Sequence, residues 1–80
     1  MNVCIVIPVY NSPYIMEVVE DVLNHGYELI VVDDGSDIMV ERDSFDFHLI
    51  THKTNQGKGE AILSGAKKAK ELGYKSFVTM

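Results

Sequence analysis

Two short, unbroken apolar runs are the feature that most constrains the fold of this chain. The first run occupies residues 3–9 and ends before Tyr10, and the second occupies residues 29–32 and ends before Asp33. A short apolar run that stops at polar, turn-forming residues is typical of a strand that is buried on both faces. The pattern therefore predicts two buried strands whose polar carboxyl ends form the rim of a site.

One helix is predicted between these two strands. Ser12 is interpreted as its N-cap and Pro13 as its first residue, and Gly26 is expected to close it. Because a helix connects them, the two strands should be parallel with a right-handed crossover. The side chains expected to face inward at helical spacing are Ile15, Val18, Val19, Val22 and Leu23.

The remainder of the chain predicts two further strands and a second helix. Residues 37–46 are interpreted as a loop with one short helical turn at 39–42, and residues 47–51 as a mixed-polarity strand at a sheet edge. A glycine-rich turn then leads into a helix from about residue 60 to residue 72, and residues 76–80 form a last strand. The residues of this second helix that are expected to face inward are Ile62, Leu63, Ala66, Ala69 and Leu72.

The resulting order, β-α-β-β-α-β, predicts an α/β fold in which helices cover both faces of a mainly parallel, four-stranded, doubly wound sheet. At 80 residues, the chain forms one small domain spanning residues 1–80. Ligands of such sheets bind outside the carboxyl ends of the strands. The polar residues that follow the first two strands are therefore the first candidates for a site.

The composition of the chain indicates which classes of partner and which cellular compartment to expect. Seven basic residues against twelve acidic ones give a net charge of −5, which argues against a nucleic-acid-binding surface. Cys4 is the single cysteine, so no disulfide can form within the chain, and a reducing, cytoplasmic compartment is expected. No apolar run approaches the ~20 residues of a membrane span, so no transmembrane segment is predicted.

Asp33 and Asp34 form the first polar motif. A carboxylate at the end of a buried strand can accept hydrogen bonds from a ligand with adjacent donors, such as a nucleobase edge or a ribose diol. The sequence Asp-Asp-Gly-Ser is also a common turn in which the Asp side chain bonds nearby backbone. Both interpretations remain open from the residues alone.

Residues 55–59, Asn-Gln-Gly-Lys-Gly, form the second motif. They lie where a strand leads into a helix, and backbone N–H groups at such a junction favour an anion. The spacing of a phosphate-binding P-loop is absent, as is a complete dinucleotide fingerprint. A glycine-rich helix entry with a solvated Lys58 explains the motif equally well. His48 and His52 lack a third ligand at suitable spacing, so no metal site is predicted.

Taken together and in order, these motifs resemble the N-terminal half of the family-2 glycosyltransferases, in particular the polyprenol-phosphate sugar transferases. The resemblance implies part of the A-type nucleotide-sugar transferase fold, with sheet order 3-2-1-4. The matching segments are residues 7–11 (Ile-Pro-Val-Tyr-Asn), 31–36 (Val-Val-Asp-Asp-Gly-Ser), 55–61 (Asn-Gln-Gly-Lys-Gly-Glu-Ala), 73–74 (Gly-Tyr) and 77–80 (Phe-Val-Thr-Met).

The resemblance also implies a site for a nucleotide-sugar donor, a UDP- or GDP-sugar. One aspartate would meet the base or ribose, and which of the two does so is left open. Gly57 and Lys58 would flank the same nucleotide. The full set of implied nucleotide-binding residues is Pro8, Tyr10, Asn11, Asp33, Asp34, Gly57 and Lys58.

One departure from the family limits the expected activity. In the family, the fourth strand runs into an Asp-x-Asp motif that holds Mg²⁺ or Mn²⁺, and this sequence ends just before it. The chain is therefore expected to be a truncated nucleotide-binding half, inactive alone, with no catalytic or metal-binding residue of its own. Inverting transfer of a hexosyl group to an acceptor would belong to full-length relatives.

Two alternatives to the transferase interpretation remain. The chain could be a non-catalytic α/β interaction module, or an inert truncated remnant. A receiver-like signalling domain ranks below both, because its acidic pair would follow the first strand rather than the second. The truncation itself has a further consequence, because a later strand covers residues 77–80 in the family. Here their strand edge would be exposed, which predicts self-association through it.

Overall fold

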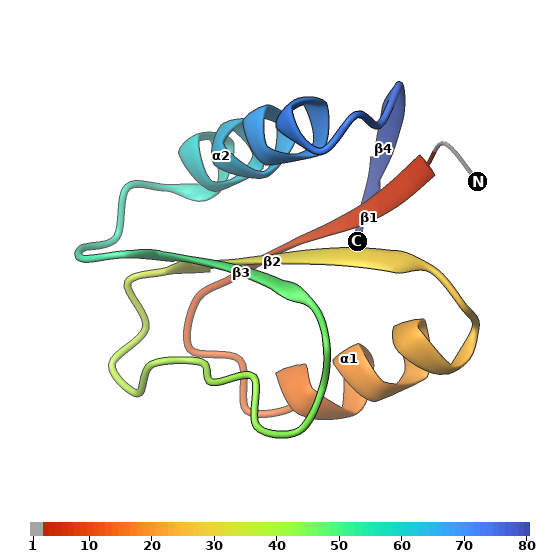
Figure 1. Ribbon diagram of the computed structural model, residues 1–80. Coiled ribbons are helices and arrows are strands. Elements are labelled where there is room, and N and C mark those ends of the chain that lie inside the picture. The colour runs from red at the N-terminus through yellow and green to blue at the C-terminus, as the bar shows by residue number, and fades with distance from the viewer. Residues whose placement is uncertain (1–2) are drawn as a thin grey trace.

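A computed structural model, which describes residues 3–80, shows a parallel sheet with one helix on each face (Figure 1). The strands lie in the order β3-β2-β1-β4, and every neighbouring pair is parallel. The predicted α/β fold and strand order are therefore confirmed. The elements are β1 (Val3–Val9), α1 (Ile15–Asn24), β2 (Glu28–Asp34), β3 (His48–His52), α2 (Lys58–Glu71) and β4 (Ser76–Thr79).

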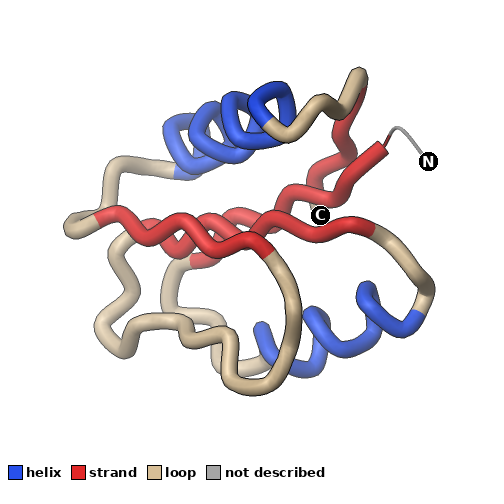
Figure 2. Tube along the Cα trace, viewed as in Figure 1, coloured by secondary structure: helices blue, strands red, loops and turns tan. Residues whose placement is uncertain are grey.

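The two central strands, β1 and β2, position the site. They are paired in register, with Val6 opposite Ile30 and Val9 opposite Asp33. Each has a strand on both sides and a helical layer above and below, so their apolar residues are almost all buried (Figure 2). Because the strands are parallel, their carboxyl ends lie at the same edge of the sheet, as the sequence predicted.

Alternation along the strands divides the core between the two faces of the sheet. Cys4 belongs to the α2 face, and burial raises the pKa of its thiol above the ordinary value. The buried residues on the α1 face are Ile5, Ile7, Val9, Ile15, Val19, Val22, Leu29, Val31, Val40 and Phe47. Those on the α2 face are Cys4, Val6, Ile30, Val32, Ala61 and Ala69.

The start of α1 differs from the prediction. The helix begins at Ile15 with Tyr14 at the N-cap position, and no side chain caps it. Ser12 and Pro13 instead belong to the turn before the helix. Asn11, at φ 54°, is hydrogen-bonded to the turn after β2. Because this contact directs the chain away from the helix axis, residues 12–14 form a turn before the helix begins. The predicted inward face and the closure at Gly26 are confirmed.

The inward face of α2 also differs from the prediction. The helix begins at Lys58 and turns its small residues, Ala61, Gly65 and Ala69, toward the sheet. Leu63, which was expected inside, is 46% exposed. A Cβ atom at Gly65 would overlap the Val6 side chain, so the helix lies closer to the sheet than large side chains would permit. Close approach, not the size of the apolar residues, sets its rotation.

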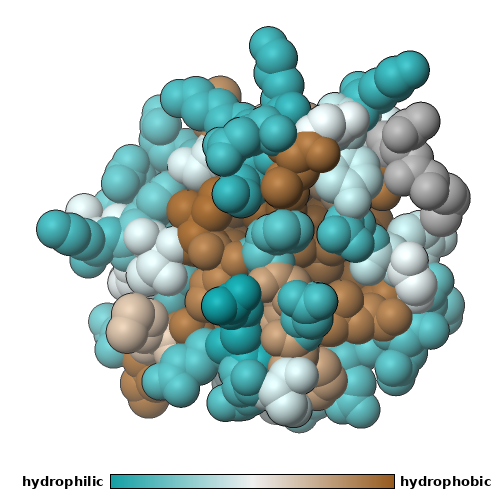
Figure 3. Space-filling model, viewed as in Figure 1, coloured by the Kyte–Doolittle hydropathy of each residue, from teal (hydrophilic) through white to brown (hydrophobic). Residues whose placement is uncertain are grey.

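The two edges of the sheet are unequal. β3 begins one residue later than predicted and is partly buried, and the preceding loop forms no helical turn at 39–42. Apolar surface shows between hydrophilic side chains in the space-filling view onto the β3 side (Figure 3). All four residues of β4 are exposed at the other edge. Neither α1 nor α2 has the length and apolar character that crossing a bilayer requires.

Candidate functional site

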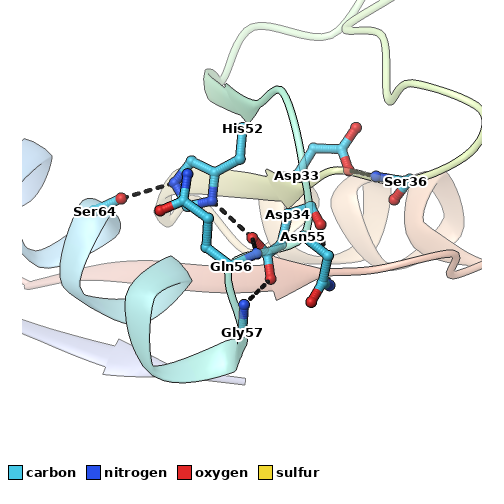
Figure 4. Close-up of polar contacts among 8 residues, drawn as sticks. All are labelled: Asp33, Asp34, Ser36, His52, Asn55, Gln56, Gly57 and Ser64. Atoms are coloured by element: carbon cyan, nitrogen blue, oxygen red, sulfur yellow. Dashed lines mark hydrogen bonds and ion pairs between the residues drawn. The ribbon is translucent and has the colours of Figure 1, made fainter.

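Asp33 and Asp34 are the last two residues of β2, so they lie where the carboxyl ends of the strands meet. This side of the sheet is called the polar edge. The two aspartate side chains leave the strand in opposite directions, as alternate strand residues do (Figure 4). Both residues are buried, with 0% and 3% of their surface exposed. Both carboxylates bond to groups of the chain itself rather than opening into a crevice.

Asp33 holds the loop on the α1 side of the sheet. One carboxylate oxygen accepts a hydrogen bond from the backbone N–H of Ser36 at 3.1 Å, and the other accepts from the N–H of Val40 at 2.8 Å. The first of these bonds closes a turn of the kind that an Asp side chain commonly makes. Asp33 thus has the turn-forming role that the sequence left open.

Asp34 joins the ends of β2 and β3 to the start of α2. Its Oδ1 accepts hydrogen bonds from His52 Nδ1 at 2.7 Å and from the N–H of Gln56 at 2.9 Å, and its Oδ2 accepts from the N–H of Gly57 at 2.9 Å (Figure 4). The His52 and backbone hydrogen bonds favour the charged carboxylate and hold the pKa of Asp34 below its ordinary value, although burial opposes this.

The predicted anion site at the start of α2 therefore already contains an anion. Gly57, at φ 102°, is the N-cap residue of α2, and Lys58 begins the helix with its side chain exposed. Helix N-termini attract negative charge, and the carboxylate of Asp34 supplies it here. The structure thus brings Asp34 and Gly57 into direct contact, 23 residues apart in sequence.

The end of β1 meets the turn after β2 through Asn11. The Asn11 N–H donates to Ser36 Oγ at 2.9 Å, and Asn11 Oδ1 accepts from the N–H of Asp37 at 2.8 Å. Tyr10, just before it, is 53% exposed. Pro8 is half-buried within β1, opposite Val32. Tyr10 and Asn11 therefore stand on the rim, and Pro8 lies within the sheet beneath it.

A hollow of about 590 Å³ opens beside this rim, on the α1 side. Of the predicted site residues only Asn11 lines it. Its lining includes the acidic residues Asp37, Glu41 and Asp43 and no lysine or arginine. A diphosphate would meet like charge there, so the chemistry of this hollow does not suit the phosphates of a nucleotide. The predicted residues do not gather around this hollow. Asn11 bonds to the turn after β2, whereas Asp34 bonds to the entry of α2.

Gly35 lets these two regions pack against each other. It has φ 77°, and a Cβ atom there would overlap the backbone of Thr54 and Asn55. The side chain of Asn55 also donates to the carbonyl of Asp34 at 3.2 Å. The turn after β2 and the loop after β3 are therefore held in direct backbone contact.

His52 and Ser64 belong to this polar network, although they were not among the predicted site residues. His52 pairs with Asp34 across β2 and β3, and its Nε2 lies 2.9 Å from Ser64 Oγ on α2. The predicted strand order could have placed the end of β3 beside Asp34. The predicted rotation of α2 gave no reason to place Ser64 there, since it turned Leu63 toward the sheet.

The sheet order and the paired strand ends define part of the A-type fold of the nucleotide-sugar transferases. The family model described as glycosyl transferase family 2 matches residues 4–77, and the chain belongs to this family. The predicted resemblance is thereby confirmed, and the receiver-like alternative is set aside.

One similar protein is the UDP-N-acetylglucosamine–dolichyl-phosphate N-acetylglucosaminyltransferase of Methanococcus voltae. It is 35% identical over the matched region, which covers 94% of this chain and 38% of that protein. The chain therefore spans well under half the length of the curated relative that it matches. No solved structure matches the chain.

Proposed function

We propose that this chain forms the nucleotide-binding part of a glycosyl transferase that uses a UDP- or GDP-sugar as donor. Family membership supports glycosyl transfer as the reaction class. The observation that carries the proposal is the junction of β1 and β2, where Asn11 bonds the turn that follows Asp33 and Asp34. In parallel α/β sheets this edge is where nucleotides bind.

The proposed roles follow from exposure and charge. Tyr10 offers an exposed aromatic ring on which a base can stack, and Lys58 offers an exposed cation for the diphosphate. Pro8, Asn11 and Gly57 shape the backbone around the ligand. Asp33 and Asp34 support the site from within by holding the turn after β2 and the entry of α2, because their carboxylate oxygens accept internal hydrogen bonds.

A divalent metal ion has no evident ligand set in this part of the protein. Among residues 3–80, no three His, Cys, Asp or Glu side chains form a group that could hold one. Both aspartates at the polar edge are engaged by backbone donors or His52. The donor set therefore does not fit the Mg²⁺ or Mn²⁺ that the family's chemistry implies.

Calorimetric titration with UDP and GDP, with and without Mn²⁺, tests the proposal. We expect saturable binding of at least one nucleotide, weakened by Tyr10→Ala and by Lys58→Ala, each by about threefold to thirtyfold. Lys67→Ala, which removes another exposed lysine of α2, is the matched control and should bind normally. A folded protein that gives no binding heat at millimolar nucleotide would instead favour the non-catalytic interaction module.

We also propose that the chain associates with itself through β4. All four residues of this edge strand are exposed, and Phe77 and Val78 are 37% and 50% exposed. An uncovered strand presents unpaired backbone groups beside apolar side chains, which favours pairing with another strand.

A further inference from the structure

A continuous chain of side-chain hydrogen bonds runs from β2 through β3 to α2. Asp34 Oδ1 lies 2.7 Å from His52 Nδ1, and His52 Nε2 lies 2.9 Å from Ser64 Oγ (Figure 4). The His52 and Asp34 side chains are only 10% and 4% exposed. A buried, fully connected polar chain of this kind fixes the orientation of each member.

Protonation chemistry fixes the direction of these bonds. The Asp34 carboxylate can only accept, so the Nδ1 atom of His52 carries a proton. In a neutral imidazole, Nε2 is then the acceptor, and the Ser64 hydroxyl donates to it. In a charged imidazolium, Nε2 donates and the hydroxyl oxygen accepts. Because a hydroxyl can do both, Ser64 keeps the chain connected in either state.

The other hydrogen bonds of Asp34 reach the proposed phosphate side of the site. The carboxylate accepts from the N–H groups of Gln56 and Gly57, which lead directly into Lys58. Gly57 has a left-handed φ of 102°, so the path of this turn is not that of ordinary extended or helical backbone. By accepting from both amides, the Asp34 carboxylate ties this turn to the end of β2.

The same three residue types form nucleophilic triads in hydrolases, but the surroundings of Ser64 do not suit that chemistry. An acyl-transfer serine needs N–H donors that can bind a developing oxyanion. Ser64 lies inside α2, where backbone N–H groups bond to carbonyls four residues earlier. The chain of hydrogen bonds is therefore suited to holding Asp34 in position rather than to attacking a substrate.

We propose that His52 and Ser64 are positioning residues for nucleotide binding. Through Asp34 they hold the Gln56–Gly57 turn in the conformation that presents Lys58 to the ligand. This inference rests on the proposed nucleotide-binding function, and it assigns a role to two residues that lie outside the predicted site.

The first test needs no nucleotide. In Ser64→Ala the amides of Gln56 and Gly57 should exchange with solvent about threefold to tenfold faster, as measured by nuclear magnetic resonance, because the loss of one link loosens Asp34. Ser64→Thr keeps the hydroxyl and should restore slow exchange. Ser44→Ala, an exposed loop serine, is the matched control. Unchanged exchange at both amides in Ser64→Ala would overturn the proposal.

The second test is calorimetric titration of the same variants with UDP and GDP. Ser64→Ala should bind about threefold to tenfold more weakly, and Ser64→Thr and Ser44→Ala should bind normally. His52→Asn keeps a donor near the Nδ1 position but loses the link to Ser64, so it should resemble Ser64→Ala.

The two proposals fail in different ways. Normal binding by Ser64→Ala, in a protein that binds nucleotide, would overturn the positioning role and leave the proposed function standing. No binding by the unmodified protein would overturn both, whatever the exchange rates show.

Discussion

At the scale of single residues, Asp34 makes the stability of the fold depend on pH. Its pKa in the folded protein is lowered below its ordinary value, first by the hydrogen bond from His52. Its charged form therefore contributes stability that is fully present above the unfolded pKa and is lost as the pH falls through the folded pKa. We expect Asp34→Asn to be less stable than the unmodified protein near neutral pH, and to lose less further stability on acidification.

Urea unfolding between about pH 6 and pH 3 measures this difference. The midpoints of the two proteins should converge as the pH falls below about 4, because protonation removes from the unmodified protein what the substitution has already removed. Midpoints that stay equally far apart across the range would contradict the assignment.

At this scale the sequence predicts where Asp33 and Asp34 lie, but not which groups they bond to. The end of an apolar run is a local signal, so the position of Asp33 and Asp34 followed directly from it. The hydrogen-bond partners of Asp34 could not be predicted in this way, because His52 and Gly57 lie 18 and 23 residues away from it along the chain. Pocket residues inferred from motifs alone could therefore not be separated into ligand contacts and internal supports.

At the scale of elements, the contact between α2 and the sheet depends on Gly65. A Cβ atom there would overlap Val6 and contact Val32, both of which belong to the two central strands. Gly65→Ala should therefore lower the free energy of unfolding by about 1–3 kcal/mol, since the helix must move away from the sheet.

Gly59→Ala is the matched control in the same helix. No atom lies within 4 Å of a Cβ placed at Gly59, so the substitution should be neutral or stabilising by up to about 1 kcal/mol. Chemical unfolding of both variants measures the difference. Equal effects of the two substitutions would show that helix propensity, not close packing, governs this contact.

The same contact explains which elements could be predicted. Periodicity found both helices and all four strands, because burial on one face leaves a regular apolar pattern. The predicted inward face of α2 was wrong, because the apolar pattern favours large residues such as Leu63 over Ala61 and Gly65 as core residues. How closely two elements approach depends on the facing residues of both, here including Val6, and a pattern within one helix does not contain that information.

At the scale of the whole molecule, the core consists of two thin layers, one on each face of a four-stranded sheet. The edge of the sheet formed by β4 is exposed. A chain of 80 residues buries a smaller share of its surface than a larger domain does, so additional burial through association has a proportionately large effect on stability. The exposed residues of β4 provide both apolar area and backbone pairing groups.

We therefore expect a concentration-dependent increase in mass, measured by light scattering or sedimentation. Val78→Lys should shift the protein toward the monomer, because a charge on an edge strand opposes pairing with a second copy. Ile38→Lys places the same charge on a side chain that is 88% exposed in the loop after β2, away from the sheet edge, and should leave association unchanged. A monomer at every concentration, or equal effects of the two lysines, would show that β4 is not the surface through which copies of the chain meet.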